Sequence, residues 1–341
     1  MKKIISLILI LSLVFVAGCK KEETNQEITE NPAIEVEEEK KEEVPEFIKL
    51  METNTRPVAV MIDNDGPSSR PQKGVESAYM VYEIIVEGGA TRMMAIIKDA
   101  PNMGKVGPIR SSRHYFLDFA LEHDAIYCHA GWSPKAQSDI SKLKVNNVNG
   151  ILGNDGVNFY RDKTYDSTWH NLYADLDKIY AYSVDKKGYR GTTDVKHTAY
   201  ESKEFDLENG NNASTVTLPY SNKYKVRFVY NPEEKVYTRY IGEKEHMSQT
   251  GDVLTAKNII VYNLRNYNLN DGENKGRQEI ETVGSGKGYY ITNGKAVEIS
   301  WAKDGRTNKT VYKYADGTEL KLNMGTTYVQ IMPTNASITI E

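Results

Sequence analysis

The sequence predicts an α+β protein in which a mixed α/β N-terminal domain precedes a β-rich C-terminal domain. Two observations favour this class. In the first half, apolar runs typical of buried strands alternate with segments whose apolar residues have helical spacing. Past about residue 201, short β-rich runs separated by turn residues dominate. With 341 residues, of which 39% are apolar, the chain can bury a sizeable core in one or two domains.

The first half begins with three predicted strands. A continuous apolar run over 58–62 ends at a turn, and the runs over 79–86 and 93–97 are separated by a Gly-Gly pair. We expect the last two runs to form a hairpin. Helical spacing then predicts a helix over 112–121, and the apolar run over 125–129 predicts another strand.

Two further helices follow in the first half. Ser133 followed by Pro134 is typical of the N-cap and first turn of a helix. A last helix is expected over about 171–182, where leucine and isoleucine residues recur on one face. The loop over 209–214 has no periodicity, so we place the boundary between two domains there, with the first over 53–205 and the second over 215–341.

The second half is predicted to be a β meander or small barrel. Strands over 225–230 and 235–241 flank an Asn-Pro turn, and strands over 289–292 and 295–301 flank Asn293-Gly294, which is a strong type I′ hairpin signal. Asp316-Gly317 separates two more short runs in the same way. A final strand is expected over 328–332.

The N-terminus has the pattern of a lipoprotein signal. Two lysines and an apolar stretch over 4–16 precede Ala17, Gly18 and Cys19, which reads as a lipobox. We predict cleavage after residue 18 and a lipid anchor of acyl chains such as palmitate on Cys19. The alternative is an uncleaved anchor with an incidental cysteine. The lipid-anchored protein would lie at the extracytoplasmic face of the cell membrane.

Residues 19–52 are predicted to be an acidic, disordered tether. Four lysines and eleven glutamates lie between residues 19 and 48, with a single aromatic residue, so this segment cannot compensate the entropy cost of folding. The rest of the chain is nearly neutral, with 37 basic and 36 acidic residues beyond residue 48. This balance gives no electrostatic reason to expect nucleic acid as a partner.

Five motifs, in order and at matching spacing, resemble those of the YerB-like bacterial lipoproteins, a family of uncharacterised function. The motifs are Arg56-Pro57-Val58-Ala59-Val60-Met61-Ile62-Asp63-Asn64, Val81-Tyr82-Glu83-Ile84 with Glu87-Gly88-Gly89 and Thr91-Arg92, Val106-Gly107-Pro108-Ile109-Arg110-Ser111-Ser112-Arg113, His129-Ala130-Gly131 with Ser133-Pro134, and His170-Asn171-Leu172-Tyr173. The resemblance covers roughly residues 53 to 335. It implies an N-terminal α+β domain, a separate C-terminal domain and lipid anchoring at the cell surface, and it implies no particular reaction.

The third motif contains a candidate anion site. Arg110, Ser111, Ser112 and Arg113 enter a predicted helix, where free backbone N–H groups, hydroxyls and guanidinium groups converge on an anion. If both arginines lie on the first turn, they share a face. The alternative is structural: the arginines pair inside the domain with nearby carboxylates, and the serines only cap the helix. The candidate carboxylates are Asp63, Glu83 and Glu87.

The last two motifs contribute four more candidate ligand-binding residues. His129 and Ser133 flank a strand-to-helix turn, and His170 and Asn171 precede a predicted helix. If the imidazoles meet near Arg110, one pocket would combine an anion binder with titratable groups. The alternative for each histidine is a core residue bonded to the backbone. We treat the remaining histidines as surface or packing residues: His114, His123, His197 and His246.

Several common chemistries are absent from the sequence. It contains no His-Glu-x-x-His or Cys-x-x-Cys pattern, so we predict no metal site and no cofactor. Cys128 is expected to be a buried packing residue. We predict a surface lipoprotein that binds an anionic cell-envelope ligand, such as a cell-wall fragment, or an envelope protein. The alternative is a wall-directed hydrolase or transferase that uses His129 or His170 as acid/base. Enzyme activity is the less favoured of the two.

Overall fold

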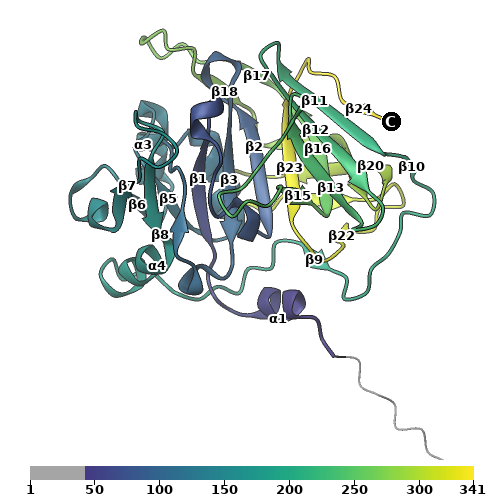
Figure 1. Ribbon diagram of the computed structural model, residues 1–341, viewed down its shortest axis with the longest axis horizontal. Coiled ribbons are helices and arrows are strands. Elements are labelled where there is room, and N and C mark those ends of the chain that lie inside the picture. The colour runs from purple at the N-terminus through teal and green to yellow at the C-terminus, as the bar shows by residue number, and fades with distance from the viewer. Residues whose placement is uncertain (1–42) are drawn as a thin grey trace, which may run out of the picture. The chain divides into compact units, whose positions relative to one another are not determined.

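A mixed eleven-stranded sheet is the main element of the structure, and its strands come from both halves of the sequence (Figure 1). The computed structural model describes residues 43–341, and the chain from Val44 to Glu341 forms one compact unit. The strands of the sheet are β1 (Val58–Asn64), β2 (Met80–Ile85), β3 (Thr91–Ile97), β5 (Ile126–His129), β6 (Asn147–Asn149), β10 (Asn211–Asn212), β16 (Asn258–Leu264), β19 (Gly284–Thr292), β20 (Lys295–Lys303), β21 (Val311–Lys313) and β23 (Thr327–Pro333). Their order is β10-β20-β19-β16-β23-β2-β3-β1-β5-β6, with β21 paired to β20.

The apolar runs of the first half form neighbouring strands of this sheet, and their assignment as strands is confirmed. Every residue of β1 and β3 is buried, which explains why these strands read as continuous apolar runs. The predicted hairpin is confirmed, because β2 and β3 pair in antiparallel register. β1 pairs antiparallel with β3 and parallel with β5, and the first of these registers places Asp63 opposite Arg92.

A second sheet of six strands is built entirely from the second half of the chain. Its order is β14-β13-β12-β11-β24, with β15 paired to β13. The strands are β11 (Thr215–Ser221), β12 (Tyr224–Asn231), β13 (Val236–Ile241), β14 (Lys244–Glu245), β15 (Thr255–Ala256) and β24 (Thr339–Ile340). Burial alternates along β11, which is typical of a strand with one face on the core.

The predicted hairpins of the second half are present. β12 and β13 pair around the Asn-Pro turn, and β19 and β20 pair around Asn293-Gly294. Both of these turn residues have positive φ, 47° and 73°, as a type I′ turn requires. The expected meander or small barrel is not what forms, because β16, β19, β20, β21 and β23 join the central sheet instead. β23 lies between β2 and β16 and is parallel to both. The central sheet therefore contains strands from both sides of the predicted domain boundary.

The helices are short and lie mostly in the first half. They are α1 (Glu46–Glu52), α2 (His114–Glu122), α3 (Pro134–Lys142) and α4 (Leu176–Asp185), with 3₁₀ turns η1 (Pro67–Ser69), η2 (Val75–Ser77), η3 (Glu87–Gly89), η4 (Ala100–Asn102) and η5 (Gly153–Asn158). The predicted cap of α3 is confirmed, since the Ser133 hydroxyl accepts a hydrogen bond from Ala136 N at 3.3 Å. No described helix is long and apolar enough to cross a membrane.

Two segments differ from the sequence prediction. The first four residues after Asn171 form strand β8 (Leu172–Asp175), and helix α4 begins only at Leu176. The cause is pairing with distant segments, because β8 lies between β4 (Lys105–Val106) and β7 (Phe159–Arg161). The remaining short strands are β9 (Ala199–Tyr200), β17 (Asn266–Asn268), β18 (Gln278–Ile280) and β22 (Lys321–Leu322).

The end of the predicted tether is also ordered. Residues 46–52 form α1, whose Ile48 is buried and whose Phe47 ring contacts Tyr200 edge-on at 4.9 Å between centroids. Phe47, Ile48 and Met51 have the spacing of an apolar helix face, which the high charge of the neighbouring residues obscures. The signal peptide, Cys19 and the tether up to residue 42 lie outside the described residues.

A buried ion pair connects the two halves of the chain. Arg239 of β13 donates to Glu83 of β2 with 2.7 Å between Nη2 and Oε2, and both side chains are fully buried. The other carboxylate oxygen of Glu83 accepts hydrogen bonds from the hydroxyl of Tyr224 at 2.9 Å and from Thr91 at 2.7 Å. Glu83 therefore faces the second sheet and not the candidate anion site, so it does not support Arg110 or Arg113.

Candidate functional site

Arg110 and Arg113 lie just before α2 and not on its first turn. The helix begins at His114, and Arg113 is its N-cap residue with extended backbone. Arg110 lies beside the end of β1, where its N–H donates to Met61 O at 2.9 Å. The two side chains therefore do not form one clamp from adjacent turns of a helix, and each has its own carboxylate partner.

Arg110 belongs to a buried group around Asp63. Its Nε lies 3.3 Å from Asp63 Oδ2, and the same oxygen is 2.7 Å from His170 Nδ1. Burial alone would raise the pKa of the Asp63 carboxyl, but the hydrogen bond from His170 and the charge of Arg110 outweigh it and lower the pKa below its ordinary value. The same hydrogen bond raises the pKa of His170. His170 and Arg110 thus meet through a shared carboxylate, whereas the second imidazole expected beside them, that of His129, does not take part.

Arg113 forms a second ion pair nearby. Its Nε is 2.6 Å from Glu87 Oε1, and Arg92 Nη2 lies 3.9 Å from the other oxygen of Glu87. Burial, together with the charge of Arg113, lowers the pKa of Arg92 to about 10. We call Arg92, Arg110 and Arg113, with Asp63 and Glu87, the arginine cluster. A third carboxylate lies at its edge, since Asp65 Oδ2 is 3.9 Å from Arg110 Nη2, so the three guanidinium groups are matched by three carboxylates.

The remaining predicted site residues have mainly structural contacts. The Ser111 carbonyl accepts from Arg92 at 2.6 Å, and the Ser112 hydroxyl accepts from the buried Tyr127 hydroxyl at 2.9 Å. The Asn171 amide donates to Asp166 O at 2.9 Å. Ser133 caps α3. These contacts match the alternative in which the polar residues of the motifs organise the local backbone.

His129 lies apart from Asp63 and His170. It is fully buried, with Nδ1 2.8 Å from Gly131 O and Nε2 3.2 Å from Asn147 Oδ1. Burial lowers the pKa of this imidazole. Since both ring nitrogens have protein partners, His129 is a core histidine and is not available as an acid or base for a ligand. Cys128 beside it is fully buried, as predicted.

A surface cavity of about 330 Å³ opens next to the arginine cluster. We call it the tryptophan groove; it is lined by Ile109, Arg110, Ser111, Ala130, Gly131, Trp132, Ile151, Arg161, Trp169 and Leu172. The guanidinium of Arg110 lies 4.1 Å from the ring centroid of Trp169, which is 57% exposed. Ile151 is 60% exposed at the same groove. Exposed aromatic and aliphatic surface beside cationic groups is typical of a ligand site.

The sequence contained a usable signal for this groove. The chain has only three tryptophans, and two of them, Trp132 and Trp169, lie within or beside the motifs with Gly131 and His170. Arg161 has no comparable signal, since it reaches the groove only because β7 pairs with β8. Arg92 follows from register, because it lies directly opposite Asp63 in the β1–β3 pair.

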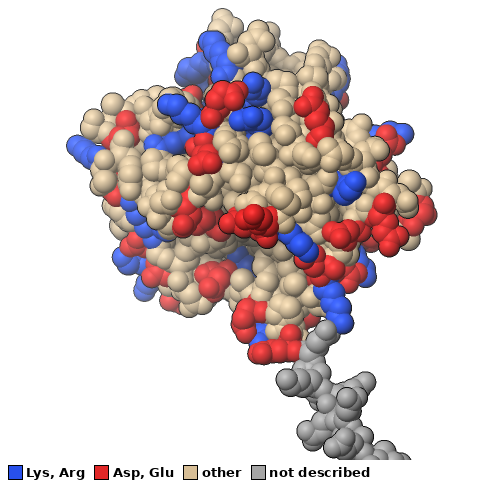
Figure 2. Space-filling model, turned by 45° about the vertical axis from the view of Figure 1, so that its right-hand side comes forward, with Lys and Arg blue, Asp and Glu red and all other residues tan. Residues whose placement is uncertain are grey.

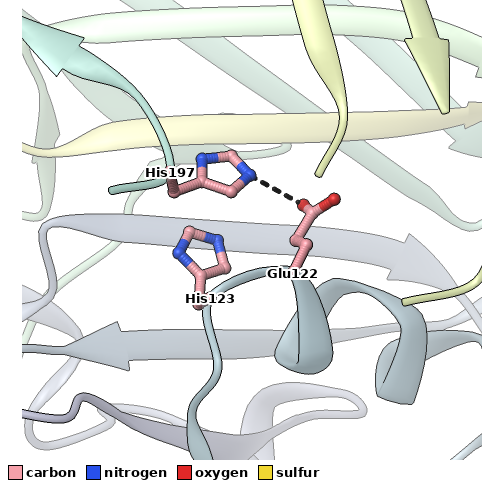
Figure 3. Close-up of side chains that lie close together, drawn as sticks. All are labelled: Glu122, His123 and His197. Carbon is pink, nitrogen blue, oxygen red and sulfur yellow. Dashed lines mark ion pairs between the residues drawn. The ribbon is translucent and has the colours of Figure 1, made fainter. Parts of the chain in front are cut away.

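A second polar cluster lies on the other side of the core, where Glu122, His123 and His197 come together (Figure 3). Their potential ligand atoms lie within 4.8 Å of one another, close enough to hold a metal ion. These atoms already have partners, however. Glu122 accepts from Lys303 at 2.7 Å and Tyr82 at 2.6 Å, and the ring nitrogens of His123 lie 2.8 Å from two tyrosine hydroxyls. His197 Nε2 lies 3.1 Å from Glu122 Oε1, so the three residues form one internal polar network that the sequence pattern did not indicate.

Charge on the visible surface is mixed. Figure 2 shows basic and acidic side chains interspersed over one face of the body, without a large area of a single sign. This distribution agrees with the nearly neutral composition beyond residue 48. A basic surface for nucleic acid is not indicated on that face.

Comparison with known proteins identifies the family. The domain model described as protein of unknown function (DUF3048) N-terminal domain matches residues 47–190, and the DUF3048 C-terminal domain matches residues 216–329. YerB of Bacillus subtilis (strain 168), a candidate lipoprotein by name, is 30% identical over 291 residues, which cover 82% of each chain. A crystal structure of B. subtilis YerB superposes with a TM-score of 0.73 at 28% identity and covers 85% of this chain and 95% of that one. The predicted resemblance is confirmed, and the chain belongs to the YerB-like family that the two DUF3048 domains define.

Proposed function

We propose that this protein is a surface-anchored lipoprotein whose tryptophan groove binds an anionic ligand of the cell envelope. The observation that carries the proposal is the meeting of two guanidinium groups and two indole rings in one open cavity. The name of the B. subtilis relative supports lipid anchoring. The lipobox ending at Cys19 is where we predict the acyl chains to be attached. Cys19 itself lies outside the described residues.

Arg161 is the cation best placed to meet an anion. Its Nη1 donates to Asn171 Oδ1 at 2.8 Å, which orients the guanidinium, and no described carboxylate lies within ion-pair distance of it. Arg110 is already paired with Asp63 and contributes less. A guanidinium with free N–H groups recognises carboxylate or phosphate through two parallel hydrogen bonds.

The two indoles favour a glycan over a simple ion. Trp169 is largely exposed and is held by its contact with Arg110, so its ring offers a flat apolar surface at little entropy cost. A sugar ring packs on such a surface while its carboxylate or phosphate meets Arg161. We therefore favour an anionic wall glycan as the ligand. An envelope protein is the second candidate, because exposed Ile151 and Val157 extend the apolar surface.

A catalytic role gains no support from this arrangement. Neither His129 nor His170 lines the groove, and His129 has both ring nitrogens occupied. An acid/base residue must reach the proton that it transfers, directly or through one water. The hydrolase or transferase alternative has no specific observation in its favour.

Arg161→Ala is expected to weaken binding of a soluble, carboxylate- or phosphate-bearing wall glycan fragment by about tenfold or more, because it removes a charge-assisted hydrogen bond. Trp169→Ala is expected to weaken binding similarly by removing the stacking surface. Calorimetric titration measures both. Arg265→Ala is the matched control, since Arg265 is an exposed arginine paired with Glu281. Unchanged affinity in both groove variants would exclude the groove as the glycan-binding site. If the variants instead failed to capture an envelope protein that the wild type captures, the ligand would be a protein.

Cys19→Ala is expected to release the protein from the membrane fraction almost completely. The acyl chains on Cys19 are the anchor that we predict for the cleaved chain, and this variant cannot carry them. Membrane fractionation and incorporation of radiolabelled palmitate test this directly. Retention of both the label and the membrane association in the variant would show that the lipobox assignment is wrong.

A further inference from the structure

A second cavity lies at the end of the central sheet that is opposite to the arginine cluster. It has a volume of about 250 Å³ and is lined by Ile48, Met51, Glu52, Pro57, Tyr79, Met80, Lys98, His123, Val195, Lys196, His197, Thr198, Ala199 and Tyr200. Pro57 directly precedes β1, and Met80 is the first residue of β2. Asp63 of the arginine cluster lies near the other end of β1. Helix α1 forms one wall and the segment over 195–200 forms another. We call this cavity the Lys98 pocket.

Lys98 is the unusual residue of this pocket. It follows β3 directly, is only 5% exposed, and has no hydrogen bond or ion pair with any described residue. The other buried lysine of the described chain, Lys303, is 1% exposed and bonds Glu122 at 2.7 Å. Burying a charge is costly unless it is paired, and the chain pairs Lys303 but leaves Lys98 facing a cavity.

The other charged groups at the pocket do not neutralise Lys98. Lys196 adds a second positive charge and donates to Glu52 O at 3.1 Å. The Glu52 side chain is exposed and makes no ion pair with Lys98. Burial and the neighbouring His197 lower the pKa of His123 well below its ordinary value, so His123 is neutral at pH 7. The walls are mostly apolar, and the pocket therefore combines an unmatched cation with an apolar body.

We propose that the Lys98 pocket binds a small carboxylic acid with an apolar tail. A carboxylate supplies the single negative charge that Lys98 lacks. A phosphate dianion would need several free donors, whereas Lys196, Tyr79 and Thr198 at this pocket already have partners. A cavity of roughly 150 Å³ holds a benzene molecule, so one of about 250 Å³ accommodates about ten non-hydrogen atoms. A medium-chain fatty acid such as octanoate has this size and this combination of charge and apolar surface.

A bound ligand would also contact helix α1 and hold it against the rest of the domain. Helix α1 contributes Ile48, Met51 and Glu52 to the pocket and forms the last residues of the predicted tether. An apolar tail between α1 and the segment over 195–200 would add contacts to both walls. This site is separate from the tryptophan groove, so it does not rest on the function proposed above.

Calorimetric titration of the full chain carrying Cys19→Ala tests the proposal, with octanoate, octan-1-ol and inorganic phosphate as probes. We expect one octanoate per chain, octan-1-ol binding at least about tenfold more weakly, and no binding of phosphate. Lys98→Met and Lys98→Gln should each reduce octanoate affinity by about 10- to 100-fold, the value of a charge-assisted hydrogen bond. Lys178→Met is the control, because it removes one exposed lysine of α4 that pairs with Asp175.

Circular dichroism establishes that each variant is folded. Met and Gln differ in polarity and shape, so a loss of affinity shared by both Lys98 variants reflects the missing charge and not altered packing. Absence of octanoate binding overturns the proposal, and so does equal binding to the Lys98 variants. Equal affinity for octanoate and octan-1-ol overturns the assignment of a carboxylate ligand. Because Arg161 and Trp169 are intact in these variants, the result is independent of the wall-glycan titration.

Discussion

Arg239→Met is expected to lower the free energy of unfolding by about 3–5 kcal/mol, the typical effect of removing one partner of a buried ion pair. Arg239 and Glu83 are both fully buried, with 2.7 Å between donor and acceptor. The variant would leave the Glu83 carboxylate in the core with only neutral donors, Tyr224, Thr91 and Asn64, around it. Denaturation in guanidinium chloride, followed by circular dichroism, measures the change.

The design of this experiment separates charge from packing. Glu83→Gln in the Arg239→Met background removes the unpaired charge and should recover part of the loss. Arg265→Met is the control for loss of an exposed arginine, and we expect a small effect because surface ion pairs contribute little. An Arg239→Met protein as stable as the wild type would contradict a fully buried, charged pair between the two halves.

The same ion pair illustrates what the sequence does not contain. Glu83 and Arg239 are 156 residues apart, and each lies in a strand whose local pattern predicts only a strand. Local patterns did predict β1, β2, β3, β12, β13 and the β19–β20 hairpin, because apolar runs and turn residues act over a few residues. The insertion of β23 between β2 and β16 depends on pairing across most of the chain, which periodicity does not encode.

The candidate site was predictable to a similar extent. Two of the three proposed carboxylates do pair with the motif arginines, since Asp63 meets Arg110 and Glu87 meets Arg113. Each of these residues lies at a strand end or turn within one of the sequence motifs, which made it recognisable without the fold. The third carboxylate, Glu83, points to the opposite face of β2 from its neighbours, because side chains alternate along a strand. Lys98 was missed because a single lysine after an apolar run reads as the end of a strand, and only the fold shows that it lacks a partner.

Lys98→Met is expected to raise the free energy of unfolding at pH 7 by on the order of 1 kcal/mol, because solvent at the open cavity screens part of the cost of the charge, and this sign is opposite to that of Arg239→Met. Burial, with a contribution from the charge of Lys196, lowers the pKa of Lys98 from 10.5 to about 8. A pKa that is lower by one in the folded chain corresponds to about 1.4 kcal/mol of unfavourable interaction in the charged form. Methionine has a similar length and no charge, so it removes this cost while keeping most of the apolar contacts.

The pH dependence gives the sharper test of this effect. Below pH 8, Lys98 is charged in both the folded and the unfolded chain, and the full cost is present. Between pH 8 and 10.5 the unfolded chain binds more protons than the folded one, so the wild-type protein gains stability as pH rises. The advantage of Lys98→Met should therefore be largest at pH 7 and shrink toward zero near pH 10.5. Tyr79 and Tyr200 at the same pocket do not interfere, because burial raises the pKa of both.

Guanidinium denaturation of the wild type, Lys98→Met and Lys178→Met at pH 7, 8.5 and 10 measures this difference. The Lys178 variant should follow the wild type at each pH, since that lysine is exposed. A Lys98→Met protein less stable than the wild type at pH 7 would mean that the ammonium group is favourably solvated or paired, contrary to its isolation in the structure. A stabilising, pH-dependent effect would instead show that the chain keeps a destabilising charge at an open cavity, as proteins commonly do where a residue serves binding and not folding.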